Sequence, residues 1–190
     1  MKNNIKLSST LTISRYRELE KKRDRKSIAD FILKRFTERY IQPLKAPPKH
    51  GFCIMAVCCL MIEALESFWK GWSDTNGRSK EAFLCFFERC KKLNSGLGVF
   101  SEVAEDFYVG VRCGILHQAE TTRGWRIWRK GSLYCSNEKI INAKKFLREL
   151  ENVLKAYCEE LRNSDWNDKI WENLRKKMDA VIKNCEPQAS

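Results

Sequence analysis

The segment from Phe52 to Trp69 constrains the fold most, because as a helix it is apolar on nearly every side. Such a helix is stable in water only when other elements cover it, so we expect it at the centre of the protein. Its apolar run over residues 52–62 is too short to cross a bilayer, and it leads into Glu63 and Glu66. We therefore expect the core helix of a soluble protein.

The rest of the chain predicts further helices, because apolar residues recur every three or four positions along most of it. Ser27, Ser79 and Ser101 stand where side chains that cap helix N-termini are expected. Aromatic and β-branched residues around Lys130-Gly131 instead predict a short hairpin or an irregular loop. The expected helices cover residues 27–42, 52–69, 79–93, 102–119, 138–162 and 165–184. The sequence thus predicts an all-α bundle of about five to six helices, with a small β-hairpin-like insertion after the fourth.

The N-terminal end differs in pattern from the bundle. Residues 1–14 alternate weakly and predict an extended arm or disorder, whereas residues 15–26 are rich in charge and indicate a solvated helix or a basic arm. We expect three parts, namely a basic N-terminal arm or helix (1–26), the helical bundle (27–185) and a C-terminal tail (186–190).

The nine cysteines raise the question of a metal site or of disulfides. Their odd number argues against a complete disulfide framework, and closely paired C-x-x-C ligands do not occur. We expect reduced, partly buried cysteines and no metal or other cofactor. An apolar signal segment is not evident at the N-terminus, so we expect a cytoplasmic protein.

The charge balance is strongly basic, with 36 Lys and Arg against 24 Asp and Glu and a net charge of +12. A soluble protein this positive usually binds something negative. Nucleic acid is the leading candidate, and an anionic membrane surface or an acidic protein would suit the same charge.

The stretch VRCGILHQAE, residues 111–120, places Arg112 five positions before His117, one of the two histidines in the chain. Residues five apart differ by about 140° around a regular helix, so these two side chains point in different directions. They can converge if the helix is irregular, for instance at Gly114, or if a dimer's two-fold axis brings one chain's arginine to the other chain's histidine.

A stripe of small residues shares this helix. Asp106, Gly110, Cys113 and His117 recur at helical spacing, and Gly110, Cys113 and Gly114 are all small. Small side chains let another backbone approach closely, from a neighbouring helix or from the same helix of a second subunit. Asp106 is about 16 Å from His117 along the axis, so we expect it to reach a shared site only across a dimer.

In this setting the sequence resembles the HEPN domains. RCGILHQ, late in a helix and followed by a basic loop, is similar to their R-x4-6-H motif, and the buried helix CCLMIEALESFW with its acidic residue is similar as well. The resemblance covers residues 27–185 in helix order and is motif-specific at 112–118. HEPN domains are helical bundles that commonly dimerise. Many are metal-independent endoribonucleases of toxin–antitoxin, phage-defence and CRISPR systems, and others only bind.

The resemblance implies a homodimeric, metal-independent endoribonuclease with Arg112 and His117 as catalytic residues. Histidine can move a proton near pH 7, and arginine can hold the charge of a phosphorane. Cys113 departs from the family, which often has a polar residue there, commonly asparagine. Because a thiol orients an imidazole less well than an amide, activity would be reduced or absent. Gln118 either hydrogen-bonds near the phosphate or is an ordinary surface residue.

Two further groups support the site. Glu63 lies in an apolar helix, and a buried carboxylate needs a partner. That partner is either Arg112 or a lysine elsewhere, unless Glu63 faces solvent. The segment TTRGWRIWRKG has basic and aromatic residues that can hold phosphates and stack bases, although its tryptophans can equally pack onto the bundle. The candidate RNA-binding residues are Arg123, Trp125, Arg126, Trp128, Arg129 and Lys130.

Three functions follow from these patterns. The first is the homodimeric endoribonuclease, which acts on RNA without a membrane and is expected in a toxin or defence module with an antitoxin or regulatory partner. The second is a catalytically silent protein of the same fold that binds nucleic acid or an acidic partner. The third is a structural helical protein in which Arg112 is a core ion pair with Glu63.

Overall fold

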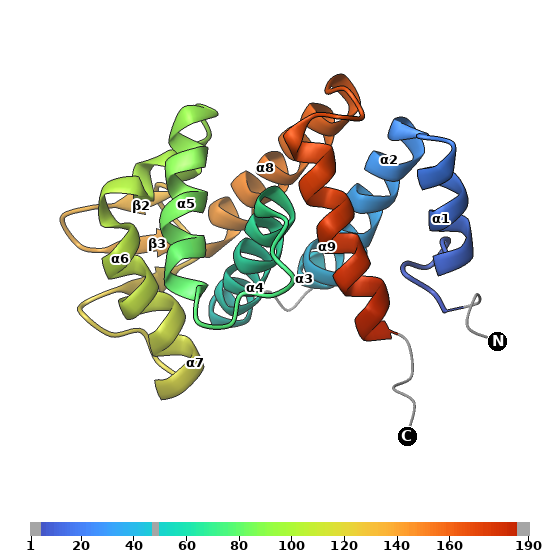
Figure 1. Cartoon of the computed structure of the whole chain (residues 1–190). Coiled ribbons are helices and arrows are strands. Elements are labelled where there is room, and N and C mark those ends of the chain that lie inside the picture. Colours follow the sequence, from blue (N-terminus) through green and yellow to red (C-terminus); the bar gives the residue numbers. More distant parts are fainter. Residues whose placement is uncertain (1–4, 47–49, 186–190) are drawn as a thin grey trace.

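The computed structural model describes residues 5–46 and 50–185, and a single helix, α4 (Gly51–Lys70), runs through its centre (Figure 1). Twelve residues of α4 are buried, and helices α5, α8 and α9 pack against it. By length and composition α4 could cross a membrane, but 61% of its apolar window is buried inside the protein, as in a core helix. The expectation of a central buried helix is confirmed.

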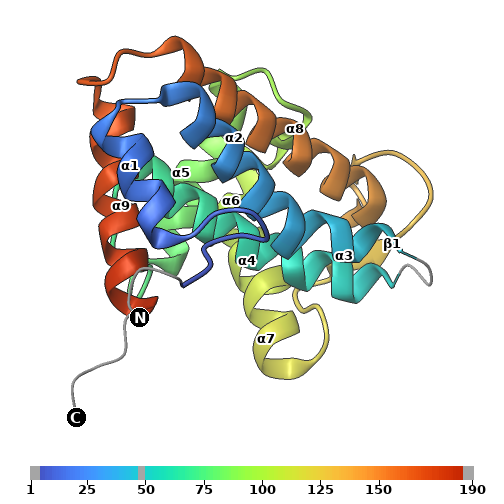
Figure 2. The same ribbon diagram turned by 90° about the vertical axis from the view of Figure 1, so that its right-hand side faces the viewer.

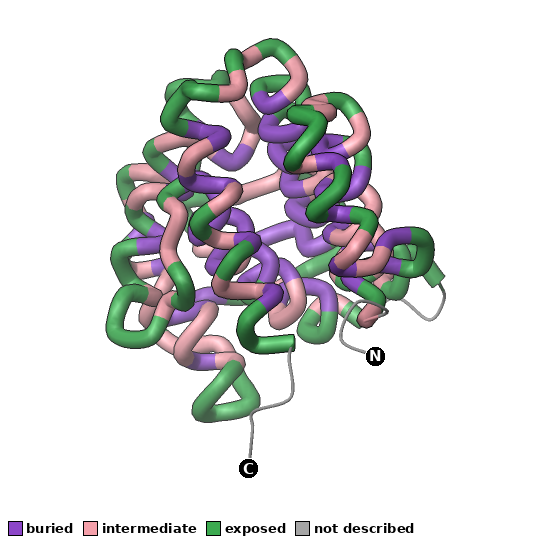
Figure 3. The backbone as a smooth tube through the Cα atoms, turned by 45° about the vertical axis from the view of Figure 1, so that its right-hand side comes forward, coloured by how far each residue is buried: buried purple, intermediate pink, exposed green. Residues whose placement is uncertain are grey.

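The other elements form a bundle around α4, with one small sheet on one side (Figure 1). The helices α2 and α8 run side by side (Figure 2), and buried residues lie where the helices meet (Figure 3). This confirms an all-α bundle with a small strand insertion. The remaining helical segments are α1 (Ile13–Lys21), α2 (Arg25–Phe36), η2 (Thr37–Ile41), α3 (Gln42–Lys45), α5 (Ser79–Lys92), η3 (Gly96–Val103), α6 (Ala104–Phe107), η4 (Tyr108–Cys113), α7 (Gly114–Gln118), α8 (Ala143–Asn163) and α9 (Lys169–Cys185).

The N-terminal segment belongs to the same core as the bundle. Lys6 and Thr12 form a β-bridge, Leu7 is fully buried, and α1 buries its apolar face, including Tyr16, against α2. Residues 15–21 are therefore helical but packed on the core, in place of the solvated helix or basic arm expected over residues 15–26, and Arg25 and Lys26 already belong to α2. Residues 1–4 and the expected tail, 186–190, lie outside the described residues.

The helix starts differ from the sequence-based expectations. The carboxylate of Asp24 accepts a hydrogen bond from the backbone N–H of Ser27 at 3.0 Å, so α2 begins two residues earlier than expected. Ser79 lies inside α5 and is not its cap. Ser101 lies inside the 3-10 helix η3, whose cap is Ser95. Asp24 and Ser95 thus cap their helices in place of the expected serines, whereas α5 has no side-chain cap and the hydroxyl of Ser79 donates to Glu63 instead.

The insertion is a small three-stranded sheet, which fits the expected small β-hairpin-like insertion, although the two strands on either side of Lys130-Gly131 do not pair with each other. Strand β1 (Arg126–Trp128) pairs in parallel with β3 (Ile140–Asn142), and β2 (Tyr134–Cys135) pairs antiparallel on the other side of β3. Asn142 ends β3 and also caps α8, because its side chain accepts a hydrogen bond from Lys145 N at 3.2 Å. The residues expected to begin the fifth helix at 138 therefore form a turn and a strand.

Candidate functional site

The helix that contains Arg112 is not regular. The segment expected to be one helix from 102 to 119 is divided into the end of η3, the short α6, the π-helical η4 and the short α7. Arg112 lies in η4, just before Gly114, where an irregularity was expected. π-Helical turns are rare and are frequently found at functional sites.

Arg112 makes an ion pair with the central helix. Its Nε donates to Oε1 of Glu63 at 2.8 Å, and the side chains of Arg112 and Glu63 are 17% and 10% exposed. The other carboxylate oxygen accepts from Thr75 at 3.1 Å and from Ser79 at 2.8 Å. The expected Arg112–Glu63 partnership is confirmed, and the carboxylate has three donors around it.

The positive charge of Arg112 is stable. Burial alone would lower the pKa of Arg112, but the nearby Glu63 carboxylate outweighs burial, so the pKa is raised and the guanidinium stays protonated. The ring of Tyr108 lies 5.6 Å from the guanidinium carbon, and half-buried Cys113 lies beside both residues. The pair thus fixes a permanent cation between α4 and η4.

A cavity opens beside this cation. It has a volume of about 190 Å³ and lies between α4 and α7. Leu60 and Leu116 at its edge are 55% and 58% exposed, although both are large apolar side chains. The lining residues are Ala56, Cys59, Leu60, Arg112, Ile115 and Leu116. Arg112 therefore lines a small, mainly apolar hollow at the protein surface.

His117 lies in the last turn of α7, which projects from the lower end of the bundle in Figures 1 and 2. It is exposed, as is Gln118, and it does not line the Arg112 cavity. Among the described residues, the side chain of His117 has no hydrogen-bond or ion-pair partner, and no hydrogen bond joins it to Arg112. One chain therefore does not assemble the two expected catalytic side chains into a pair.

Asp106 has a structural role within its own chain. Its carboxylate accepts from Lys139 Nζ at 2.7 Å and from Trp125 Nε1 at 2.9 Å, and Arg123 lies 3.5 Å away. Burial would raise the pKa of Asp106, but the hydrogen bond from Lys139 and the other donors outweigh it, so the pKa is lowered. The expectation that Asp106 acts at the site finds no support in these contacts, because all three partners belong to the insertion that follows α7.

Trp125 cannot stack on a base, because it is only 2% exposed. Its ring packs edge-on against Phe107 at 5.7 Å and stacks on Tyr134 at 5.5 Å. The expected RNA contact by Trp125 is therefore wrong, and the alternative of packing onto the bundle is correct for this residue. Trp128, which is 49% exposed, keeps its ring at the surface.

The basic residues of the insertion divide into two groups. Arg123 pairs with Asp106, and Arg126 lies 3.5 Å from Glu138, so both charges are partly neutralised within the protein. Arg129 and Lys130 lie exposed beside Trp128 at the end of β1 and line a surface hollow with it.

The small residues before His117 have an intramolecular explanation. A Cβ atom at Gly110 would lie 2.3 Å from Cδ1 of Trp125, and one at Gly114 would lie 2.6 Å from the backbone oxygen of Glu120. The close approach expected from the sequence therefore occurs, but the approaching backbone is the chain's own loop after α7. The stripe carries no information about a second subunit.

Sequence reasoning missed Thr75 and Ser79, the two hydroxyl donors to Glu63. No local signal could have found them, because Thr75, in the loop between α4 and α5, and Ser79, at the start of α5, reach the carboxylate only when α5 packs on α4. It also missed Lys144, which follows the cap Asn142 and shares a hollow with Trp128. The sequence placed the start of this helix at 138, so only the structure shows that Lys144 lies in the first turn of α8, where an acid is usual.

The nine cysteines are free thiols. Within residues 5–46 and 50–185, no three side chains of His, Cys, Asp or Glu gather where they could hold a metal ion.

In comparisons with known proteins, no protein-family model, no curated protein and no solved structure matches the chain.

Proposed function

We propose that the protein is a metal-independent endoribonuclease of HEPN type that acts as a homodimer. Each active site would combine Arg112 of one chain with His117 of the other. One observation carries the proposal. Arg112 is held by Glu63 at the edge of a surface cavity, whereas His117 extends unpaired from the projecting end of the same helical segment.

The chemistry needs only these two side chains and the substrate. His117 takes the proton of a ribose 2′-OH, whose oxygen attacks the adjacent phosphorus as the bond to the 5′ oxygen breaks. Protonated His117 then gives this proton to the leaving 5′ oxygen, so the histidine is regenerated and the products are a 2′,3′-cyclic phosphate and a 5′-OH. Arg112 stabilises the additional negative charge of the phosphorane, because its planar fork can contact two phosphate oxygens.

Exposed apolar side chains support the dimer. Phe52 and Leu60 on α4 and Leu116 on α7 are 36%, 55% and 58% exposed, and the last two border the Arg112 cavity. A two-fold contact uses the same patch on both chains, so burying this face against its own copy would bring the two Arg112 cavities together. The toxin or defence setting, the cytoplasmic location and an antitoxin partner remain expectations from the resemblance.

The test is RNA cleavage in excess EDTA by wild type, Arg112→Ala, Arg112→Lys and His117→Ala, with the product ends checked for 2′,3′-cyclic phosphate. We expect both alanine variants to be inactive. An equal mixture of Arg112→Ala and His117→Ala chains should recover about a quarter of the wild-type activity, because half the dimers are mixed and each has one intact site.

Two substitutions serve as controls, namely His50→Ala, which removes the other exposed histidine, and Arg15→Ala, which removes an exposed arginine on α1. Both should cleave as wild type does. If the mixture of two inactive variants stays inactive after subunit exchange, the shared site is wrong. If His117→Ala cleaves normally, the proposed chemistry is wrong.

A second candidate is a protein that binds nucleic acid without cleaving it. Two observations favour it, namely the Cys113 thiol where a polar residue is usual and the separation of Arg112 from His117 within one chain. Folded wild type that retains a mixed RNA pool without cleaving it would establish this function instead.

A further inference from the structure

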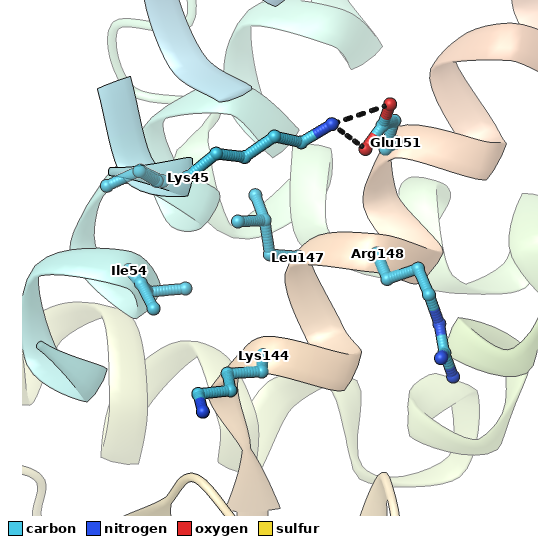
Figure 4. Close-up of a pocket in the computed structure, with 7 residues that line it drawn as sticks. Lys45, Ile54, Lys144, Leu147, Arg148 and Glu151 are labelled. Carbon is cyan, nitrogen blue, oxygen red and sulfur yellow. Dashed lines mark hydrogen bonds and ion pairs between the residues drawn. The ribbon is translucent and has the colours of Figure 1, made fainter. Parts of the chain in front are cut away.

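Two surface hollows beside the insertion share Lys144 and together form a basic trough. One has a volume of about 400 Å³ and is lined by Trp128, Arg129, Lys130 and Lys144. The other, of about 420 Å³, continues along α8 between α3 and α4 (Figure 4). Its lining residues are Leu44, Lys45, Ile54, Lys144, Leu147, Arg148 and Glu151.

Positive charge predominates in the trough. Its one acidic lining residue, Glu151, is paired with Lys45 at 2.9 Å and with Lys155 at 3.4 Å. Lys144 and Arg148 extend away from that pair (Figure 4). Within the described part of the chain, Lys130 and Lys144 have no ion-pair partner, and Arg148 is 3.7 Å from its nearest acid, Glu149. The trough therefore contains cations that the protein itself does not neutralise.

The backbone adds to the positive electrostatic potential of the trough. Gly51 at the start of α4 lies close to Ala143 at the start of α8, since a Cβ on Gly51 would be 3.9 Å from that of Ala143. Neither helix has an acidic residue in its first turn, and α8 has Lys144 and Lys145 there. Helix N-termini carry partial positive charge, so cations at this place cost the isolated fold free energy. An anionic ligand would remove that cost.

We propose that this trough binds single-stranded RNA. Lys144 and Arg148 are one turn apart on α8, with about 5–6 Å between Cβ atoms, so each can contact a different phosphate of one strand. Lys130 extends the phosphate contacts, and the exposed ring of Trp128 stacks on one unpaired base. The choice of RNA rests on the proposed function, whereas the location rests on the trough's charge and its exposed aromatic ring.

The test measures binding of a fluorescent single-stranded oligoribonucleotide of about 20 nucleotides, long enough for one site. All variants carry His117→Ala, so that cleavage does not interfere. We expect Lys144→Ala/Arg148→Ala to weaken binding about tenfold and to reduce the slope of log K against log salt by about 1.4, the value for two lost phosphate contacts. Trp128→Ala should weaken binding about tenfold and Trp128→Phe much less, because phenylalanine still stacks.

The matched control is Lys22→Ala/Lys26→Ala, which removes the same charge from an exposed surface. These lysines flank Arg25, whose side chain bonds to Ser164 at the far end of α8, about 30 Å from Lys144. Equal weakening in the control and the trough variant would overturn the site. The single-strand assignment would be overturned if duplex RNA or phosphatidylserine vesicles bound as tightly as the single-stranded oligoribonucleotide and if Trp128→Ala did not weaken that binding. RNA binding that depends on the trough, together with no RNA cleavage by the wild-type protein, would contradict the proposed nuclease. The trough would then remain supported as an RNA-binding site.

Discussion

At the scale of single residues, Glu63 determines most of what the candidate site can do. It is an acid in an otherwise apolar helix, and it is satisfied there by Arg112, Thr75 and Ser79. A buried ion pair of this kind adds little stability compared with apolar packing, but breaking it leaves an unpaired charge in the protein. The pair therefore fixes the position of Arg112 more than it stabilises the fold.

Glu63→Ala should lower the free energy of unfolding by about 3 kcal/mol, because it leaves Arg112 without its counterion. Glu63→Gln should cost less, since the amide oxygen still accepts hydrogen bonds from the hydroxyls of Thr75 and Ser79. Urea unfolding measures both. If both variants lost the same small amount of unfolding free energy, Arg112 would be solvated by water once Glu63 is removed.

Asp106→Asn should destabilise the protein at neutral pH, and this difference from wild type should shrink in acid. The folded-state pKa of Asp106 lies below the usual value of 3.8, so its ionised form contributes stability above that value and loses it as the pH falls through the folded pKa. Unfolding free energies from pH 7 down to pH 2 measure this. A difference that stays constant with pH would show that the charge of Asp106 is not involved.

At the scale of elements, the η4–α7 segment and the loop that follows it are fitted together. The loop passes so close to Gly110 and Gly114 that neither position has room for a side chain. Thr122 N donates to the backbone oxygen of Gly110 at 2.8 Å, an acceptor that the π-helical turn leaves to the loop. The loop then enters β1 through buried Trp125, which joins the insertion to the aromatic core.

Gly110→Ala should destabilise the protein by about 2 kcal/mol, because its methyl group would overlap the Trp125 ring and force it out of its packed position. Thermal unfolding measures the loss, and near-ultraviolet circular dichroism reports the displaced tryptophan. A variant as stable as wild type would mean that the loop can move away from η4 at little cost.

Ala119→Gly should have the opposite effect. Ala119 ends α7 with φ at 54°, in the left-handed region that a glycine adopts without strain. Removing this strain outweighs the added chain entropy of glycine, so we expect a gain of about 0.5 kcal/mol. Urea unfolding checks the sign, and a loss of stability would contradict the backbone conformation at the end of α7.

At the scale of the whole molecule, the proposed function depends on a second copy that covers the exposed apolar face of α4 and α7. Leu60 and Leu116 border the Arg112 cavity, and the trough with Lys144 lies at the N-terminal ends of α4 and α8. In the proposed dimer the apolar face holds the two chains together, while the trough stays open to the RNA strand.

Leu116→Glu should make the protein monomeric and inactive without unfolding it. Leu116 is 58% exposed, so the substitution should change the stability of one chain by no more than about 0.5 kcal/mol, whereas a charge at the centre of an apolar interface opposes association. Light scattering measures the mass, and circular dichroism measures the fold. Leu93→Glu, at a 43% exposed position outside this face, is the control and should leave both mass and cleavage unchanged.

The sequence by itself determined the helical class, the buried central helix and the need of Glu63 for a partner, with Arg112 as one of the alternatives. These follow from local periodicity and from the cost of burying a carboxylate alone. Only the tertiary structure decided that Trp125 is buried while Trp128 is exposed, that Gly110 and Gly114 receive the chain's own loop, and that Lys144 joins the insertion in one trough. The strand order β1-β3-β2 was also decided there. Each of these depends on contacts between residues distant in the chain, and such contacts leave no periodic trace in the sequence.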